Sequence, residues 1–504
     1  MWMSLMKLDL ASVGLAVSLG FIFVVLFEIF RIKSYRGKTP PGPTPLPFVG
    51  TIPHFLLNPM EFIRSLSQYG EMTTLYLGRK PAIFLNTVEL AKEAMVQNAS
   101  SFSGRPPIPL LMWVTEGYGI VMATYGHSWK QQRRFALHSL RNFGLGKKSV
   151  EERVIEESSY LVPEMLKSEG KPFDPQHAIQ NAVSNIICSI VFGDRFDYDN
   201  KRFAYLLEIV RENIIQSGAF LDRYKQVFNL LPIIKHFPGP HQKMYQNAEE
   251  LKAFIRDAVK THRETLDPDS PRDFIDAYLL EIEKQNSNED STFHEDNMVM
   301  SVSDLFLAGT DTTATTIRWS LIFLTQNPHV QERCHEEIVR VLGYDRMPSM
   351  DDRDKLPYTH ATVHEIQRCG NIVPSGVFHE TTQPAKLRGY DIPKGTAVFT
   401  NLTAILTNKE HWKYPDTFNP ENFLDDNGHF FKPESFLPFS LGPRVCLGES
   451  LAKTELFLFI TSLLQRIHFS WPPGAKWPDM NGIVSVVRSP EAYDIICHSR
   501  GSKK

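Results

Sequence analysis

Along most of the chain, hydrophobic and polar positions recur with the period of a helix. Apolar residues return every three or four positions in segments such as 272–284 and 330–343, a pattern that indicates amphipathic helices on a shared core. Residues 447–467 are apolar on nearly all faces, which predicts a helix buried on every side. These patterns favour a mainly α fold.

Strand patterns are confined to two short regions. Residues 73–86 alternate apolar and polar positions about Gly78-Arg79-Lys80-Pro81, which predicts a hairpin of two paired strands between flanking helices within 58–97. Residues 385–401 form a second β region, with glycine and proline at its turns. We therefore predict a mainly α fold with a small β region.

The amino-terminal region differs from the rest of the chain. Residues 10–27 contain no charged side chain, which is close to the minimum length that spans a bilayer. A basic cluster follows this segment, so the positive-inside rule places the body of the protein in the cytosol. A cleaved signal peptide is the alternative, but its basic residues would precede the apolar segment. The cluster comprises Arg31, Lys33, Arg36 and Lys38.

A proline-rich stretch joins this segment to the body. Residues 39–50 contain five prolines, and proline restricts both its own φ and the residue before it, which predicts a stiff extended spacer. No later segment is apolar enough to span a membrane. We expect a membrane anchor at 1–30, a basic and proline-rich hinge at 31–50, and one large domain at 51–504.

Composition narrows the possible functions. The chain is 42% hydrophobic and 22% charged with a net charge of −3, which argues against a nucleic-acid partner. Its five cysteines are odd in number, widely spaced and without a CxxC pair, so a disulfide framework or a zinc site is not expected. Such cysteine usage is typical of a reducing compartment.

Cys446 has an unusual setting. Gly442 and Gly448 flank it, and it precedes the predicted buried helix, where unpaired N–H groups favour a thiolate. Arg444 supplies a nearby positive charge. A phosphatase loop would carry an arginine six residues later, where Ala452 stands, and no histidine is marked out as the partner of a cysteine protease. A metal ligand is therefore favoured over a nucleophile.

The residues around Cys446 fill the pattern F-x-x-G-x-R-x-C-x-G, which resembles the haem-ligand loop of the cytochrome P450 family. The resemblance implies that the Cys446 thiolate is the axial ligand of the iron of haem b and that the surrounding loop packs on this cofactor. A structural cysteine is the alternative. The pattern positions are Phe439, Gly442, Arg444, Cys446 and Gly448.

Two further segments resemble structural motifs of the same family. Glu365 and Arg368 match the E-x-x-R pair that locks the core near the haem, although such pairs are usually solvated on helices. Residues 420–423 match the stretch in which the family often places an arginine beside this pair. Asn422 occupies that position, so we expect a hydrogen bond in place of a third charge.

Residues 305–319 combine Gly309 with several threonines, which are poor residues for a helix interior. Threonine hydroxyls can bond back to carbonyls, and a local bulge or a capped helix break would also explain them. The segment resembles the family's A-G-x-[DE]-T-T motif, which implies that Asp311 and Thr312 deliver protons during O2 activation. Position relative to the motifs nominates four residues for the substrate pocket, namely Leu307, Ala308, Val373 and Val377.

Cationic residues along the chain match the family's partners of the haem propionates. Trp129 and Arg133 share one helix face at i,i+4, and two buried carboxylates need such cations. A basic surface helix is the alternative for this pair. The resemblance adds three further propionate partners, Arg105, His379 and Arg444.

A second group of basic residues is expected near the cysteine side. Its hypothetical role is to dock an acidic reductase, and an ordinary solvated face is the alternative. The loop after Arg105 and residues 214–224 are expected to shape the substrate cavity. The basic residues are Lys130, Arg134, Arg141, Lys147, Lys148 and Lys453.

The resemblance extends from the proline hinge almost to the carboxyl end and is greatest to microsomal family 2, particularly its J subfamily. It implies a monooxygenase of the endoplasmic reticulum membrane that epoxidises and hydroxylates lipophilic compounds, among them arachidonate and xenobiotics. Electrons would come from NADPH through cytochrome P450 reductase, with cytochrome b5 as a further partner. A P450-fold isomerase and a non-catalytic haem carrier are the alternatives. The Asp311–Thr312 pair argues against the isomerase.

Overall fold

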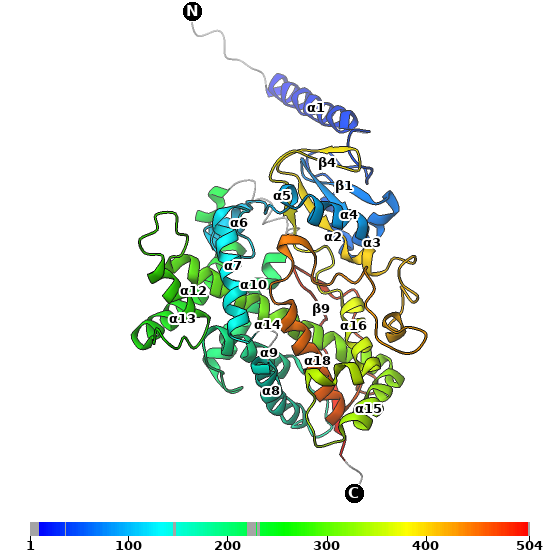
Figure 1. Ribbon diagram of the computed structural model, residues 1–504. Helices are drawn as coiled ribbons and strands as arrows, with labels where there is room; N and C mark the ends of the chain where they lie inside the picture. Colours follow the sequence, from blue (N-terminus) through cyan, green and yellow to red (C-terminus); the bar gives the residue numbers. More distant parts are fainter. Residues whose placement is uncertain (1–9, 36, 145–147, 219–227, 229–231, 502–504) are drawn as a thin grey trace, which may run out of the picture.

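The computed structural model describes residues 10–35, 37–144, 148–218, 228 and 232–501, and most of them are helical (Figure 1). The helices are α1 Leu10–Tyr35, α2 Ile52–Leu57, α3 Pro59–Ser65, α4 Val88–Lys92, α5 Ala99–Phe102, α6 Pro109–Thr115, α7 His127–Asn142, α8 Lys148–Leu166, α9 Gln176–Val191, α10 Lys201–Gly218, α12 Pro240–Thr265, α13 Phe274–Lys284, α14 Glu295–Gln326, α15 Pro328–Leu342, α16 Pro357–Gly370, α17 Leu402–Leu406 and α18 Glu449–Arg466.

The strands are short and form four small sheets. The largest has the order β1-β2-β6-β3, in which β1 and β2 are the predicted antiparallel hairpin and β6 pairs in parallel with β2. The other sheets pair β4 with β5, β7 with β10, and β8 with β9. The strands are β1 Met72–Leu77, β2 Lys80–Leu85, β3 His379–Glu380, β4 Ala385–Leu387, β5 Tyr390–Ile392, β6 Ala397–Thr400, β7 Ile467–Ser470, β8 Ile483–Val484, β9 Arg488–Ser489 and β10 Ile496–Ser499.

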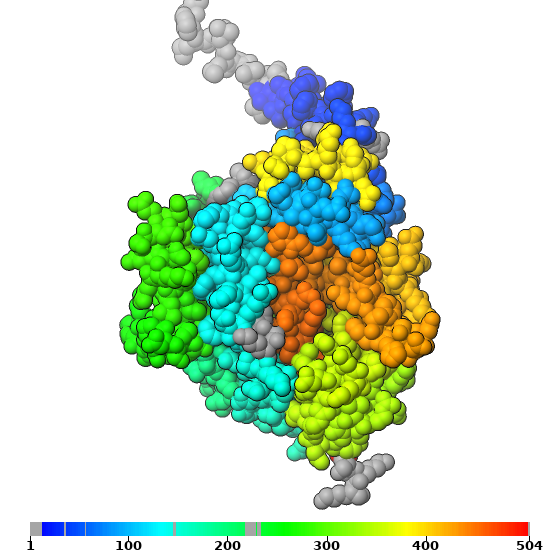
Figure 2. Space-filling model, in the orientation of Figure 1, coloured from blue at the N-terminus to red at the C-terminus, as the bar shows by residue number. Residues whose placement is uncertain are grey.

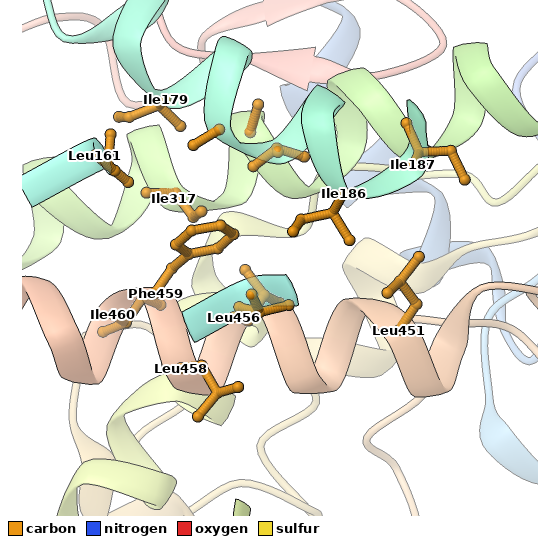
Figure 3. Packing of buried hydrophobic residues seen from close by; sticks show 14 of the residues in the cluster. Leu161, Ile179, Ile186, Ile187, Ile317, Leu451, Leu456, Leu458, Phe459 and Ile460 are labelled. Atoms are coloured by element: carbon orange, nitrogen blue, oxygen red, sulfur yellow. The ribbon is translucent and has the colours of Figure 1, made fainter. Parts of the chain in front are cut away.

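Helix α14 runs through the middle of the body and packs against α9 and α18. Side chains of α8, α9, α14 and α18 meet in one apolar cluster, in which Phe459 of α18 points toward Ile317 of α14 (Figure 3). Burial of this apolar surface is the main force that holds the layers together. The prediction of a helix buried on nearly all faces after Cys446 is confirmed by α18.

Gly309 explains how α9 approaches α14 so closely. A Cβ added at Gly309 would lie 2.9 Å from Cγ1 of Ile187 on α9. Helix α14 is continuous from Glu295 to Gln326, so neither a helix break nor a local bulge occurs at its threonines. The Thr312 and Thr316 hydroxyls instead donate to the carbonyls of Ala308 and Thr312, one turn earlier.

The proline-rich spacer packs against the sheet. The Thr74 N–H donates to the Pro41 carbonyl at 2.9 Å, and a Cβ at Gly42 would lie 2.0 Å from the Thr74 carbonyl oxygen. Glycine is therefore needed at position 42 because the two backbones touch. The spacer is extended up to Pro45, as predicted, but residues 46–50 fold into a tight turn that the Leu46 and Gly50 backbones close, and the spacer contacts β1 at Pro41 and at Gly50.

The amino-terminal helix α1 projects from the body, and its residues 13–34 are long and apolar enough to cross a membrane. Only 6% of this span is buried, as expected for a helix whose partner is lipid. The helix continues past the apolar residues 10–27, through Glu28 and part of the basic cluster, and ends at Tyr35.

Candidate active site

The loop that carries Cys446 is held in a tight turn. Gly442 has a φ of 77°, and a Cβ there would lie 2.1 Å from the Met95 carbonyl oxygen. Only glycine fits this conformation and this contact. The Cys446 N–H donates to the Phe439 carbonyl at 3.0 Å, which closes the loop just before α18 begins. An added Cβ at Gly448 would meet open space, so packing does not require glycine there.

The Cys446 side chain is exposed, and yet desolvation by the surrounding protein raises the pKa of its thiol. Together these facts indicate that the sulfur faces a space inside the body. A hydrogen bond from the Gly448 backbone and the positive charge of Arg133 act in the opposite direction and lower the pKa. A metal ion at the sulfur would displace its proton outright, because a coordinating thiol is bound as the thiolate.

Three arginines surround this space, and carbonyl oxygens hold each of them. Arg444 donates to the carbonyls of Ser103, Ile120 and Ala123 at 3.1, 3.2 and 2.8 Å, and its guanidinium lies 4.0 Å from the Trp129 ring. Arg105 donates to the carbonyls of Val121, Val377 and Phe378. Arg133 donates to the carbonyl of Val445.

Among the described residues, none of these three arginines forms an ion pair with a carboxylate. Burial, followed by the charges of the other two arginines, lowers the pKa of Arg444 to about 8. Burial and Arg133 lower the pKa of Arg105 to about 9. A buried cluster of like charges is costly unless anions neutralise it. The two carboxylates of a haem would supply those anions, so the residues present fit this group.

Trp129 and His379 lie close to the arginine cluster. The Trp129 indole N–H donates to the Ile120 carbonyl at 3.1 Å, and the Arg133 guanidinium lies 5.7 Å from the Trp129 ring. His379 Nδ1 lies 2.8 Å from the Phe102 carbonyl oxygen, so that nitrogen carries a proton. Burial and Arg105 lower the pKa of His379 to about 3. Its Nε2 would donate to a carboxylate only in the charged form.

Asp304 is a site residue that sequence reasoning missed. Its carboxylate on α14 accepts the N–H groups of Ile120 and Val121 at 2.6 and 2.9 Å, and burial raises its pKa to about 6. These two hydrogen bonds fix the turn at residues 120–121. The Ile120 carbonyl in this turn accepts hydrogen bonds from both Trp129 and Arg444. An acid within an otherwise apolar helical segment was the only available signal.

Asp311 and Thr312 lie on adjacent faces of α14. Asp311 lines a cavity of about 160 Å³. Ala314, Thr315 and Arg318 lie on the same face of α14 and line it too, and Arg211 of α10 does so as well. Burial raises the pKa of Asp311 to about 6, while Arg318 and Arg211 counteract that rise. The cavity has room for water, so the carboxyl group can exchange protons near neutral pH.

The four predicted pocket residues are at least partly accessible. Ala308 is exposed although it lies in the middle of the central helix, and Leu307, Val373 and Val377 are half-buried. Ala308 and Thr312 are one turn apart and thus share a face of α14. Part of the segment predicted to shape the cavity, residues 219–224, lies outside the described residues.

The predicted E-x-x-R pair is a buried ion pair. Arg368 donates to both carboxylate oxygens of Glu365 at 2.7 Å, and further to the carbonyls of four residues of α17 and the loop after it. The Asn422 amide donates to the same carboxylate at 3.2 and 3.3 Å. As predicted, Asn422 contributes a hydrogen bond at the position where the family often has an arginine. The four carbonyls belong to Leu406, Tyr414, Pro415 and Thr417.

The basic residues nominated for docking a reductase are mostly exposed. Lys453 is half-buried and pairs with Glu449 at 2.6 Å, which reduces the charge that it offers to a partner. Lys147 lies outside the described residues. The exposed members are Lys130, Arg134, Arg141 and Lys148.

Known proteins resemble this chain over nearly its whole length. The family model for cytochrome P450 matches residues 40–497. Cytochrome P450 2B4 of Oryctolagus cuniculus is 44% identical over 489 residues, which cover 96% of this chain and 98% of that protein. Cytochrome P450 2J2 of Homo sapiens is 45% identical over 463 residues, 91% of each chain. Cytochrome P450 2J3 of Rattus norvegicus is 44% identical over 95% of this chain and 94% of its own.

Proposed function

This chain belongs to family 2 of the cytochromes P450 and is a haem-thiolate monooxygenase of lipophilic compounds, and we propose that polyunsaturated fatty acids such as arachidonate are among its substrates. The similarity to 2J proteins and the partly accessible apolar side chains of Leu307, Ala308, Val373 and Val377 support this choice. Lipophilic xenobiotics would enter the same pocket. Epoxidation at a double bond and hydroxylation at a C–H bond are the expected outcomes.

We assign the electron supply to NADPH through cytochrome P450 reductase, with cytochrome b5 as a second donor. The exposed basic side chains of Lys130, Arg134, Arg141 and Lys148 would dock an acidic partner. The amino-terminal segment 1–30 would anchor the protein in the endoplasmic reticulum membrane, and the hinge at 31–50 would connect it to a catalytic domain at 51–504 in the cytosol. The basic cluster after the apolar segment supports this orientation.

The residues around the cysteine loop would hold haem b. Cys446 would provide the thiolate ligand, and Arg105, Arg133 and Arg444 would neutralise the propionates with help from Trp129 and His379. Phe439, in the same loop, would pack against the haem. When bound, the haem activates O2, so that one oxygen atom enters the substrate and the other leaves as water at the expense of two electrons and two protons.

The protons would pass through side chains of α14. Asp311 would take a proton from water in the adjacent cavity, and its pKa of about 6 allows it to gain and lose that proton near neutral pH. The Thr312 hydroxyl donates to the Ala308 carbonyl and can accept a further hydrogen bond on the pocket side. Ordered transfer through this pair would keep bulk water away from the reacting atoms.

The buried arginine cluster beside Cys446 is the observation that carries this proposal. Within the part of the chain that the structure describes, the three guanidiniums have no carboxylate partner, and an anionic, metal-bearing group bound beside the Cys446 thiol would supply the missing anions.

The test is product analysis with arachidonate and linoleate, using the full chain and reductase in phosphatidylcholine vesicles. We expect NADPH and O2 consumption that rises with substrate, together with epoxide and hydroxide products. Thr312→Ala should divert electrons to hydrogen peroxide. If products form without NADPH, an isomerase is indicated. If neither fatty acid is converted while another lipophilic compound is, the substrate proposal is wrong and the family assignment stands.

A further inference from the structure

A buried acid interrupts the apolar part of α1 where its uncharged residues 10–27 end. Glu28 directly follows the apolar residues 10–27, and its exposed fraction is 0%. An ionisable residue at the edge of a membrane helix is costly, and such residues commonly have a specific partner. Glu28 has two. One carboxylate oxygen accepts from Arg31 at 2.7 Å on the same helix, and the other accepts from Arg79.

Arg79 belongs to the body of the protein. It lies in the turn between β1 and β2, and its guanidinium is 5.3 Å from the Phe48 ring. The segment around Phe48 is itself tied to this hairpin, because the Thr51 N–H donates to the Tyr76 carbonyl at 2.8 Å. Figure 2 shows α1 seated against this end of the molecule. The ion pair between Glu28 and Arg79 thus joins the anchor to a rigid part of the body.

We propose that the β1–β2 turn is a docking surface for the protein's own membrane anchor, and that the Glu28–Arg79 ion pair sets the angle of the body relative to the bilayer. Glu28 marks the point where the apolar segment ends, so Arg79 must lie at the level of the lipid head groups. Three exposed apolar side chains near Arg79 would then face the same membrane surface. They are Leu46, Phe48 and Val49.

The two arginines that pair with Glu28 belong to different parts of the molecule: Arg31 to the same helix and Arg79 to the body. Arg31 lies one turn along α1 and neutralises Glu28 whether or not the body is docked. Arg79 neutralises it only when the anchor and the body are in contact. Replacement of Arg31 is therefore a matched control for replacement of Arg79: each removes one guanidinium from the same carboxylate, and only one of them breaks the link.

The test uses the full haem-loaded chain in oriented phosphatidylcholine bilayers. Linear dichroism of the haem absorption band reports the angle between the haem plane and the membrane. We expect a strong signal in the unchanged protein and in Arg31→Gln, and a loss of most of that signal in Arg79→Gln and Glu28→Gln. The double variant Glu28→Gln/Arg79→Gln should lose no more than either single variant.

A charge exchange makes the test stricter. Glu28→Arg with Arg79→Glu, in an Arg31→Gln background that removes repulsion along the helix, should restore the dichroism. The proposal is overturned if Arg79→Gln keeps the full signal, or if Arg31→Gln loses as much as Arg79→Gln. Bilayer pelleting and the absorption spectrum of the reduced carbon monoxide complex confirm that each variant is inserted and folded.

Discussion

Arg105, Arg133 and Arg444 occupy one region of the interior and donate to backbone carbonyls, without a carboxylate beside them among the described residues. Burial lowers the pKa values of all three, and the positive charges of neighbouring arginines lower the pKa values of Arg105 and Arg444 further. In the absence of a bound anion, this cluster should weaken the fold. Bound haem propionates should reverse the effect.

The Arg105→Met variant should have opposite effects on the haem-free and the haem-loaded protein. The haem-free variant should unfold at a higher urea concentration than the haem-free parent, because one of three repelling charges is gone. The haem-loaded variant should lose its cofactor faster, since a propionate loses its partner. Urea titration and haem transfer to apomyoglobin measure the two effects. Arg202→Met, at an exposed arginine, is the control, and an equal response of both variants would contradict the assignment.

Glu455 predicts a pH dependence. It is buried in α18, and burial raises its pKa to about 8 despite a hydrogen bond with Thr313. Between the ordinary pKa of about 4.5 and this value the folded state holds a proton that the unfolded state has lost, so stability falls as pH rises through this window. Glu455→Gln should therefore be more stable than the parent by ~1–4 kcal/mol at pH 8.

The difference for Glu455→Gln should shrink toward pH 5 in urea unfolding. A constant difference at both pH values would show that the Glu455 carboxyl group is not held neutral by the fold.

The sequence predicted which single residues belong to the site, but it could not predict contacts between residues that lie far apart along the chain. The motif nominated Arg105 and Arg444 but could not show that both contact the same turn. Asp304 was missed because its partners are the backbone N–H groups of Ile120 and Val121, which have no sequence signature. The amide of Asn422 was foreseen because the motif fixed its neighbour, Glu365.

Among the elements, the predicted helices and the hairpin within 73–86 are confirmed, because each depends on local periodicity. The parallel pairing of β2 with β6 was not predicted. It joins strands about three hundred residues apart, and nothing in either strand specifies its partner. For the threonines of α14, back-bonding of the hydroxyls, a bulge and a helix break were all left open by the sequence. The helix remains regular because their hydroxyls bond back one turn.

The contact between α9 and α14 makes Gly309 a sensitive position. Gly309→Ala should destabilise the protein by about 1–3 kcal/mol, because the new methyl group would overlap Ile187. Ile187→Ala as a single change should also destabilise the protein. The double variant should nevertheless be more stable than the sum of the two single effects predicts. Urea unfolding of all four proteins measures this coupling, and simple additivity would exclude the close contact.

On the scale of the whole molecule, we expect helix α1 and the body to have separate tasks. Helix α1 is almost wholly exposed, whereas the cysteine loop and the arginine cluster lie within the body. Deletion of residues 1–31 should move much of the protein from the membrane fraction to the soluble fraction without loss of haem. Fractionation with haem quantitation checks both, and a haem-free truncated protein would contradict this separation.

The most direct measurement is the absorption spectrum of the reduced carbon monoxide complex of the protein and of Cys446→Ser. The unchanged protein should give the red-shifted Soret band of a thiolate-bound haem, and Cys446→Ser should lose that band even where it retains haem. A red-shifted band that persists in Cys446→Ser, or its absence from the haem-loaded parent, would show that Cys446 is not the ligand of the iron.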